Sequence, residues 1–227
     1  MIGARNAGSP GEFFEGNLDE LAIWNTDLDG DAVAAIYNSG VPTDLSRNSG
    51  SYDNSSALKA WWRMGDGLLD ESELIGDQVN PTMGSELMTN GDFATGDLTG
   101  WTVVDGGQTV EEATNAAGDN ALHVVTDGTY CVAYQVITSL ASGSVAKLTY
   151  DFEKVSGNMA QVVNGVATTR SASGSYTVYF VSDGSDSIEF KRSGAGEWYV
   201  SNVTVKKVNG SPALLKNGAA IEAGAPS

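Results

Sequence analysis

The stretch Glu86-Leu87-Met88-Thr89-Asn90-Gly91-Asp92-Phe93, followed closely by Trp101, decides the fold of this chain. Asn90-Gly91 is a dipeptide typical of tight turns, and Phe93 is the first aromatic residue after it. Thr99-Gly100-Trp101 then starts the next predicted strand. A turn followed at once by large apolar residues indicates the opening of a β-sandwich.

Beyond this opening the chain continues to Val208 as short predicted strands. Turn residues separate them at intervals of about 8 to 12 residues, which predicts an all-β antiparallel sandwich or jelly roll. Asn164-Gly165 is the strongest hairpin signal. The strand expected over 130–137 alternates between two faces. One face carries Tyr130, Val132, Tyr134 and Val136, and the other carries Cys131, Ala133, Gln135 and Ile137.

The first part of the chain predicts a strand near 18–24 and one short amphipathic helix. Asp29 is a good helix N-cap, and Gly40 followed by Pro42 ends the helix. Trp61 and Trp62 stand side by side in a later strand, so their rings point to opposite faces. We expect one ring in the core and the other at an interface with a partner, with sugar stacking as the alternative.

Two segments of this first part resemble laminin-G-like (concanavalin A-like) jelly rolls. Phe14-x-Gly16-x-Leu18-Asp19-Glu20-Leu21-Ala22-Ile23-Trp24-Asn25 looks like the closing segment of that family, and 58–67 looks like its opening strand. The ending precedes the beginning, so the resemblance implies a partial sandwich. We expect it to pack on the following domain or to complete a sheet in a neighbouring copy. Members of the family often bind sugars, sometimes through Ca²⁺, which makes Asp19 a position to test.

These patterns predict four regions. They are a partial laminin-G-like segment with an N-terminal arm (1–67), an acidic linker with glycine and proline (68–84), a sandwich (85–208) and a C-terminal tail (209–227).

The predicted sandwich resembles the family 4-type carbohydrate-binding modules, which have a galactose-binding-like jelly roll. The matching residues are Asn90-Gly91-Asp92-Phe93, Gly100-Trp101, Ala121-Leu122-His123-Val124, Tyr134-Gln135, Leu148-x-Tyr150-x-Phe152, Ser175-Tyr176-Thr177-Val178-x-Phe180 and 198–205. The resemblance implies a structural Ca²⁺ near Asp92 and Asn90. Ser201 replaces the usual acid on the last strand, so whether calcium binds stays open.

Composition excludes several classes of partner. The chain has 29 acidic and 12 basic residues, a formal net charge of −17, which disfavours binding to nucleic acid. No stretch approaches the roughly 18 apolar residues of a membrane span, so we expect no membrane insertion. Cys131 is the single cysteine and forms no intramolecular disulfide. The residues after Met1 lack the pattern of a signal peptide.

Catalytic chemistry finds little support in the sequence. His123 is the only histidine, between apolar neighbours typical of a strand. Zinc-ligand spacing and a nucleotide-binding glycine loop are both missing from the sequence. Asp151 and Glu153 share one outward strand face, where a solvated surface explains them better than glycoside hydrolysis. We therefore expect no enzyme and no cofactor beyond the open question of calcium.

Sugar recognition requires aromatic side chains and planar polar partners on one exposed sheet face. If Leu148, Tyr150 and Phe152 are core residues, the outward set is expected to include Gln135, Gln161, Tyr179 and Arg170. Tyr179 is the best stacking candidate. Core or protein-interface roles for the same residues remain open.

The combination of a partial laminin-G-like segment, a carbohydrate-module sandwich and small polar arms resembles surface and appendage proteins of tailed bacteriophages. The resemblance implies a non-enzymatic virion structural protein, either a capsid decoration (cement) protein or a fibre component, at the virion surface. Its partners would be other copies of itself, virion proteins and a surface polysaccharide that it uses for adhesion. The alternative is a carbohydrate-binding module of a secreted polysaccharide-degrading protein.

Overall fold

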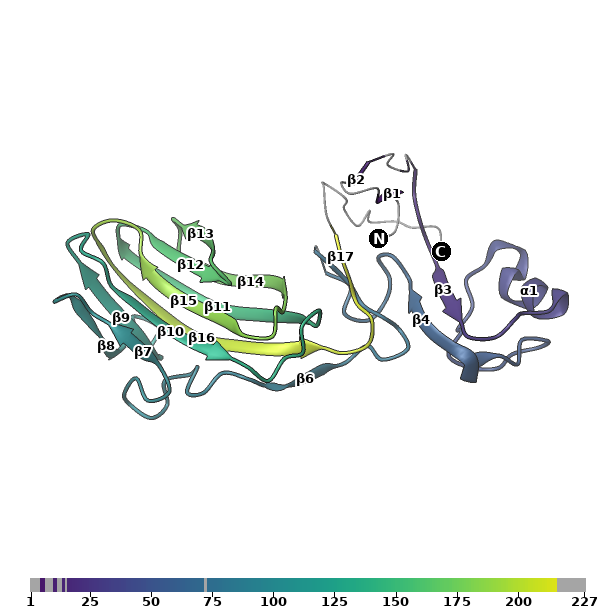
Figure 1. Ribbon diagram of the computed structural model, residues 1–227, viewed down its shortest axis with the longest axis horizontal. Helices are drawn as coiled ribbons and strands as arrows, with labels where there is room; N and C mark the ends of the chain where they lie inside the picture. Colours follow the sequence, from purple (N-terminus) through teal and green to yellow (C-terminus); the bar gives the residue numbers. More distant parts are fainter. Residues whose placement is uncertain (1–4, 7–9, 12–13, 15, 72, 216–227) are drawn as a thin grey trace. The chain divides into compact units, whose positions relative to one another are not determined.

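A computed structural model (Figure 1) describes residues 5–6, 10–11, 14, 16–71 and 73–215 of this chain. The chain forms two compact units. The first unit combines Met1–Pro81 with Gly210–Ser227, and the second unit is Thr82–Asn209. Within the described residues no helix has the length and apolar character needed to cross a membrane.

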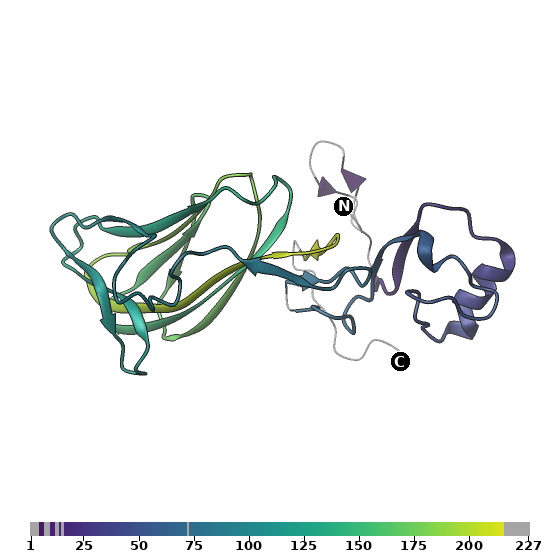
Figure 2. The same cartoon turned by 90° about the horizontal axis from the view of Figure 1, so that it is seen from below.

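The second unit is an antiparallel β-sandwich of the jelly-roll type, with its strands in two layers (Figures 1 and 2). The five-stranded sheet has the order β13-β12-β15-β10-β7. Its strands are β7 (Thr102–Val104), β10 (Val132–Ile137), β12 (Met159–Val163), β13 (Val166–Arg170) and β15 (Asp186–Arg192).

The six-stranded sheet has the order β14-β11-β16-β9-β8, and β6 also pairs with β16. Its strands are β6 (Met83–Glu86), β8 (Thr109–Thr114), β9 (Asn120–Thr126), β11 (Val145–Ser156), β14 (Gly174–Val181) and β16 (Gly196–Val208). The predicted all-β sandwich is therefore confirmed, and the predicted strands lie close to their expected positions.

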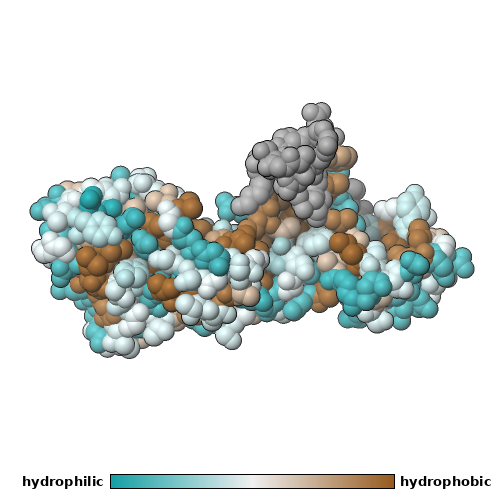
Figure 3. Space-filling model, viewed as in Figure 1, coloured by the Kyte–Doolittle hydropathy of each residue, from teal (hydrophilic) through white to brown (hydrophobic). Residues whose placement is uncertain are grey.

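A single apolar core fills the space between the two sheets. Leu148, Tyr150 and Phe152 point into it from β11, as the alternation predicted. Phe190 on β15 contributes from the opposite sheet, and its ring lies edge-on to that of Tyr150 at a centroid distance of 5.0 Å. Apolar residues also reach the surface of the sandwich, where they form patches between polar residues (Figure 3).

The opening turn explains why Asn90-Gly91 stands at the start of the sandwich. Asn90 has a left-handed backbone, with φ of 52°, and its side-chain amide donates to the carbonyls of Asp97 and Thr99. A Cβ on Gly91 would lie 2.0 Å from the carbonyl oxygen of Val203 on β16, so only glycine fits there. The turn is thereby fixed against the last strand.

The two ends of the sandwich are tied to each other. The backbone N–H of Asn209 donates to the carbonyl of Thr82 at 3.0 Å, and the Asn209 side chain donates to the Thr82 hydroxyl at 3.0 Å. The sandwich is thus an insertion into the first unit, with its entry and exit side by side.

The first unit contains three two-stranded sheets and one α-helix among its described residues. Its elements are β1 (Arg5–Asn6), β2 (Pro10–Gly11), β3 (Leu21–Trp24), α1 (Gly30–Tyr37), η1 (Asn38–Gly40), η2 (Ser55–Ala57), β4 (Leu58–Trp62), β5 (Leu74–Ile75) and β17 (Ala213–Leu214). β1 pairs with β2, β3 with β4, and β5 with β17, all antiparallel. Asp29 caps the helix as predicted, because its carboxylate accepts the N–H of Ala32 at 2.8 Å.

Trp61 and Trp62 lie on opposite faces of β4, but both rings are buried inside the first unit. Trp61 packs with Tyr52 and the helix residue Ala32, whereas Trp62 packs with Ile75 and other apolar residues of the same unit. The prediction that one of them lies at an interface is therefore wrong. Trp62 packs on residues of its own chain, among them Ile75, and not on a partner molecule.

Residues 68–84 are not the linker that the sequence predicted. Leu74 and Ile75 are buried, and the carboxylate of Asp70 accepts backbone N–H groups of Gly65, Gly67 and Gly76. The acidic and glycine residues that suggested a linker thus build a folded loop. The predicted tail likewise contains β17, while residues 216–227 lie outside the described residues.

Candidate functional site

The four residues predicted to bind carbohydrate do not come together. Gln135 points into the sandwich from β10, on the same side as the core residues Ala133 and Ile137. Its side-chain amide accepts the N–H of Thr89 at 3.0 Å and donates to the Thr89 carbonyl at 2.6 Å. Gln135 therefore clamps the opening turn and has no outward face.

Gln161 and Arg170 also point inward, from β12 and β13. The Arg170 guanidinium donates to Gln161 Oε1 at 3.0 Å and to the Tyr150 hydroxyl at 2.7 Å. It also lies over the ring of Tyr176, with its Cζ atom 4.4 Å from the centroid. Burial, the largest effect, raises the pKa of Tyr150 to about 12. This is an internal polar network that joins the two sheets, so both residues were wrongly placed on an exposed face.

Tyr179 lies on the outer face of the six-stranded sheet, the sheet opposite to that of Gln135 and Gln161. Its side chain is only 9% exposed, and Lys147 Nζ lies 5.6 Å from its ring centroid. The ring is therefore largely covered, which weakens its prediction as a stacking platform.

The residues proposed for calcium have other partners. Asn90 Oδ1 accepts the N–H of Thr95 at 3.3 Å, and Asp92 Oδ1 accepts the N–H of Ala94 at 3.3 Å. In the described part of the chain no three His, Cys, Asp or Glu side chains gather as a metal ion would require. The side-chain oxygens of Asn90 and Asp92 thus accept N–H groups of their own loop, and one carboxylate with one amide does not fit the implied ion.

The outer face of the five-stranded sheet carries a different set of side chains. The register places Tyr134 directly between Thr102 on β7 and Glu189 on β15, with Val162 next to Glu189. Tyr134 and Val136 belong to the outward half of β10, whereas the prediction of an outward Gln135 had placed them on the inner side. Side chains in such cross-strand rows lie about 5 Å apart, so they form one continuous surface.

The floor of this outer face is apolar and its polar groups lie beside it. Val162 is only 1% exposed although it points away from the core cluster, and Ala160 and Val132 are also buried there. Glu189 Oε2 lies 3.5 Å from Lys191 Nζ, and Glu189 Oε1 accepts the Ser187 hydroxyl at 3.1 Å. Across the described residues no aromatic ring or cation stacks on Tyr134. The Tyr134 ring is half-buried on this outer face.

The outer face of the six-stranded sheet carries a stacked aromatic pair. His123 and Tyr199 stack with ring centroids 4.3 Å apart and an interplanar angle of 9°. Glu197 Oε1 lies 3.2 Å from His123 Nε2, and Glu111 Oε1 lies 3.5 Å from His123 Nδ1. Desolvation and, after it, the nearby carboxylates raise the pKa of Tyr199. One face of Tyr199 is already occupied by His123.

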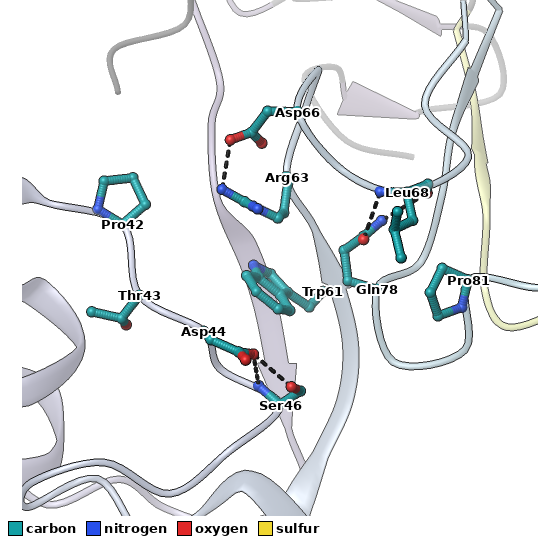
Figure 4. A pocket seen from close by; sticks show the side chains of 10 residues that line it. All are labelled: Pro42, Thr43, Asp44, Ser46, Trp61, Arg63, Asp66, Leu68, Gln78 and Pro81. Carbon is teal, nitrogen blue, oxygen red and sulfur yellow. Dashed lines mark hydrogen bonds and ion pairs between the residues drawn. The ribbon is translucent and has the colours of Figure 1, made fainter.

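The first unit has a pocket of its own, with a volume of about 520 Å³ (Figure 4). The residues that line it are Pro42, Thr43, Asp44, Ser46, Trp61, Arg63, Asp66, Leu68, Gln78 and Pro81. Figure 4 shows Trp61 between Asp44 with Ser46 on one side and Arg63 with Asp66 on the other. Of these residues, only Trp61 was predicted from the sequence to contact a partner or a sugar.

One signal in the sequence could have identified Tyr134. The strand 130–137 has two alternating sets of residues. The set with Cys131, Ala133, Gln135 and Ile137 contains no aromatic side chain, whereas the other set contains two tyrosines. The set without aromatic side chains faces the core. Choosing it as the inner set would have placed Tyr134 outside and Gln135 inside.

Comparison with known proteins finds similarity to solved structures only. No protein-family model matches the chain, and no curated protein sequence matches it. Among solved structures, the enzymatically active domain of tailspike protein 4 from bacteriophage CBA120 is 17% identical, with a TM-score of 0.45, over 54% of this chain and 21% of that one. The carbohydrate-binding module TmCBM61 in complex with β-1,4-galactotriose is 16% identical, with a TM-score of 0.43, over 54% of this chain and 98% of that one.

A structure described as a family 4 carbohydrate-binding module is 16% identical, with a TM-score of 0.42, over 53% of this chain and 99% of that one. At these identities and TM-scores the likenesses carry no argument about ligands. The function has to be argued from the surfaces described above.

Proposed function

We propose that the sandwich unit is a non-catalytic glycan-binding module, and that its ligand lies on the outer face of the five-stranded sheet. The observation that carries this proposal is the half-buried ring of Tyr134, which has no aromatic or cationic stacking partner among the described residues and lies in one row with Glu189 of the Glu189–Lys191 pair. The other outward aromatic residues discussed above have a ring or cation stacked on them: Lys147 on Tyr179, Arg192 on Tyr130 and His123 on Tyr199.

The chemistry of this face suits a sugar chain. A pyranose ring has apolar C–H groups that pack on an aromatic ring, and hydroxyl groups that need hydrogen-bond partners in the same plane. Tyr134 supplies the ring, Glu189 accepts hydrogen bonds and Lys191 donates them. Because the two charges are paired, the face favours a neutral polysaccharide over an ionic one.

The same face argues for binding without cleavage. Glycoside hydrolysis by the usual mechanisms requires two carboxyl groups on either side of the scissile bond. The row through Tyr134 contributes one carboxylate, Glu189, which is already held by Lys191 and Ser187. Asp151, on the opposite sheet, accepts hydrogen bonds from Ser175 and Asn202.

Affinity electrophoresis of the full chain in gels that contain soluble β-glucan, xylan or galactan tests the proposal. We expect retardation by at least one polysaccharide, lost in Tyr134→Ala and retained in Tyr199→Ala. The control removes the same side chain from the outer face of the other sheet. Equal retardation of both variants would exclude the Tyr134 face, and no retardation by any glycan would refute the proposal.

We further propose that this module belongs to a virion surface protein of a tailed bacteriophage, as a capsid decoration or fibre component. The support is the sequence pattern of arms and laminin-G-like segments around the sandwich. Light scattering should then give a trimer or larger assembly, and the chain should sediment with assembled particles.

The alternative is a module of a secreted polysaccharide-degrading protein. The tie between Thr82 and Asn209 favours it, because a sandwich with joined ends is readily carried as a separate module. A monomer that binds polysaccharide saturably and does not sediment with assembled phage particles would support this alternative.

A further inference from the structure

The charged groups of the pocket in the first unit are paired with one another. Arg63 Nη2 donates to Asp66 Oδ2 at 2.5 Å, and Arg63 Nε donates to Glu20 Oε1 at 3.1 Å. Asp44 accepts the hydroxyl of Ser46 at 2.5 Å, and Arg47 Nε lies 3.5 Å from Asp44 Oδ2. An ionic ligand would therefore have to break an existing pair, whereas a neutral ligand would not.

The remaining hydrogen-bonding capacity lies at the rim. A guanidinium has five N–H donors, and the two bonds of Arg63 to carboxylates leave others for a ligand. Asp66 is bonded through Oδ2, and its side chain is 51% exposed, so its second oxygen accepts from outside. Donor and acceptor thus stand side by side, as two neighbouring hydroxyl groups require.

The walls of the pocket are apolar between these polar groups. They are formed chiefly by Leu68, Pro42 and Pro81, because Trp61, which also lines the pocket, is only 5% exposed. Trp61 is held by its own hydrogen bond, since its indole N–H donates to Glu20 Oε2 at 2.7 Å, and Arg63 lies 5.6 Å from its ring centroid. The wall is therefore rigid before any ligand arrives, which lowers the cost of binding.

We propose that this pocket binds one neutral monosaccharide unit, held by the Arg63–Asp66 pair beside the exposed side chain of Leu68. A volume of about 520 Å³ lies within the range of pockets for small molecules, and paired charges between apolar walls match a ring with C–H faces and a belt of hydroxyl groups. The site lies wholly within the first unit, so it is separate from the sandwich face and does not depend on it.

The test is a titration of the ¹⁵N-labelled full chain, observed by NMR. The probes are methyl glycosides of glucose, galactose and xylose, with glucosamine and glucuronate as charged comparators. We expect a saturable shift of the Trp61 indole and Gln78 side-chain amide signals with at least one neutral glycoside. Failure of all three neutral probes, or stronger binding of a charged one, would overturn the proposal.

Variants assign the shift to the pocket. Asp66→Asn keeps the size of an exposed side chain, and Arg63→Gln removes the donor; each is expected to weaken binding about tenfold, as for one lost charge-assisted hydrogen bond. Lys59→Gln removes one positive charge from an exposed side chain of the same unit that does not line the pocket, and should bind normally. Unchanged binding in Asp66→Asn and Arg63→Gln would contradict the assignment. Tyr134→Ala should leave the Trp61 shift intact, which separates this result from the outcome at the sandwich.

Discussion

Asp77 offers the sharpest test of how the first unit is held together. Its side chain is only 2% exposed, and its carboxylate accepts three backbone N–H groups. Oδ1 accepts from Trp61 and Val79, both at 3.1 Å, and Oδ2 accepts from Ser211 at 2.8 Å. Asp77 thus connects β4, the loop after β5 and the segment that leads into β17.

The cost of Asp77→Ala follows from those three donors. The Trp61 N–H is buried, and leaving it without a partner costs about 1–3 kcal/mol. The other two donors are partly buried and regain some water, so each adds about 0.5–1 kcal/mol. The sum, about 2–5 kcal/mol, is a large fraction of the stability of a unit with small cores. Asp77→Asn keeps Oδ1 for two donors and should lose less, about 1–2 kcal/mol.

Hydrogen exchange measured by mass spectrometry in increasing urea resolves the two units. In Asp77→Ala we expect early exchange in peptides from 58–81 and 210–215, while peptides of the sandwich keep their midpoint. A shift below about 0.5 kcal/mol in the first unit would refute the reasoning, since such a value is typical of an unremarkable surface change. An equal loss in the sandwich would also refute it.

Three further changes probe the sandwich. Gln135→Leu should lower the free energy of unfolding by about 1–2 kcal/mol in urea titrations, because the Thr89 backbone loses both partners, and should leave polysaccharide retardation unchanged. The free energy of unfolding should fall as pH rises from 10 towards 12, because the Tyr150 hydroxyl has a pKa of about 12 in the core and ionises more readily in the unfolded chain. The loss should be at most about 1.4 kcal/mol per pH unit. A urea midpoint that stays constant over that range would contradict this. Arg170→Lys should cost about 1–3 kcal/mol in thermal or urea unfolding, because an ammonium cannot replace the guanidinium that reaches both Tyr150 and Gln161; a loss below about 0.5 kcal/mol would show that the network is not required.

The sandwich was predictable because a strand with one buried face alternates apolar and polar residues along the sequence. Leu148, Tyr150 and Phe152 point inward as their alternation indicated, and Asn164-Gly165 forms the turn between β12 and β13 with φ of 49° and 78°. These are local signals, each contained within a few residues.

The candidate site was not predictable in the same way. Alternation separates the two faces of a strand but does not say which face is inward when both carry apolar residues. Gln135 was placed outside because glutamine is polar, yet its partner Thr89 lies 46 positions away in sequence and satisfies it inside. The contacts of Arg170 with Tyr150 and Gln161 are equally non-local.

The folded loop at 68–81 was missed for a related reason. Its acidic residues were read as solvated, but Asp70 and Asp77 accept backbone N–H groups, and β5 pairs with a strand that follows the whole sandwich. The pocket was missed for the same reason, because Asp44, Arg63 and Gln78 are distant in sequence and only the fold brings them together.

The joined ends of the sandwich have a consequence for the order of folding. β5 and β17 must find each other across all of Thr82–Asn209 if that stretch is still a random chain. Once the Asn209–Thr82 contacts form, the effective loop shrinks to a few residues, which lowers the entropic cost of closure by about 2 kcal/mol. We therefore expect the sandwich to fold before β5 and β17 pair, and a substitution that separates Thr82 from Asn209 to destabilise the first unit as well.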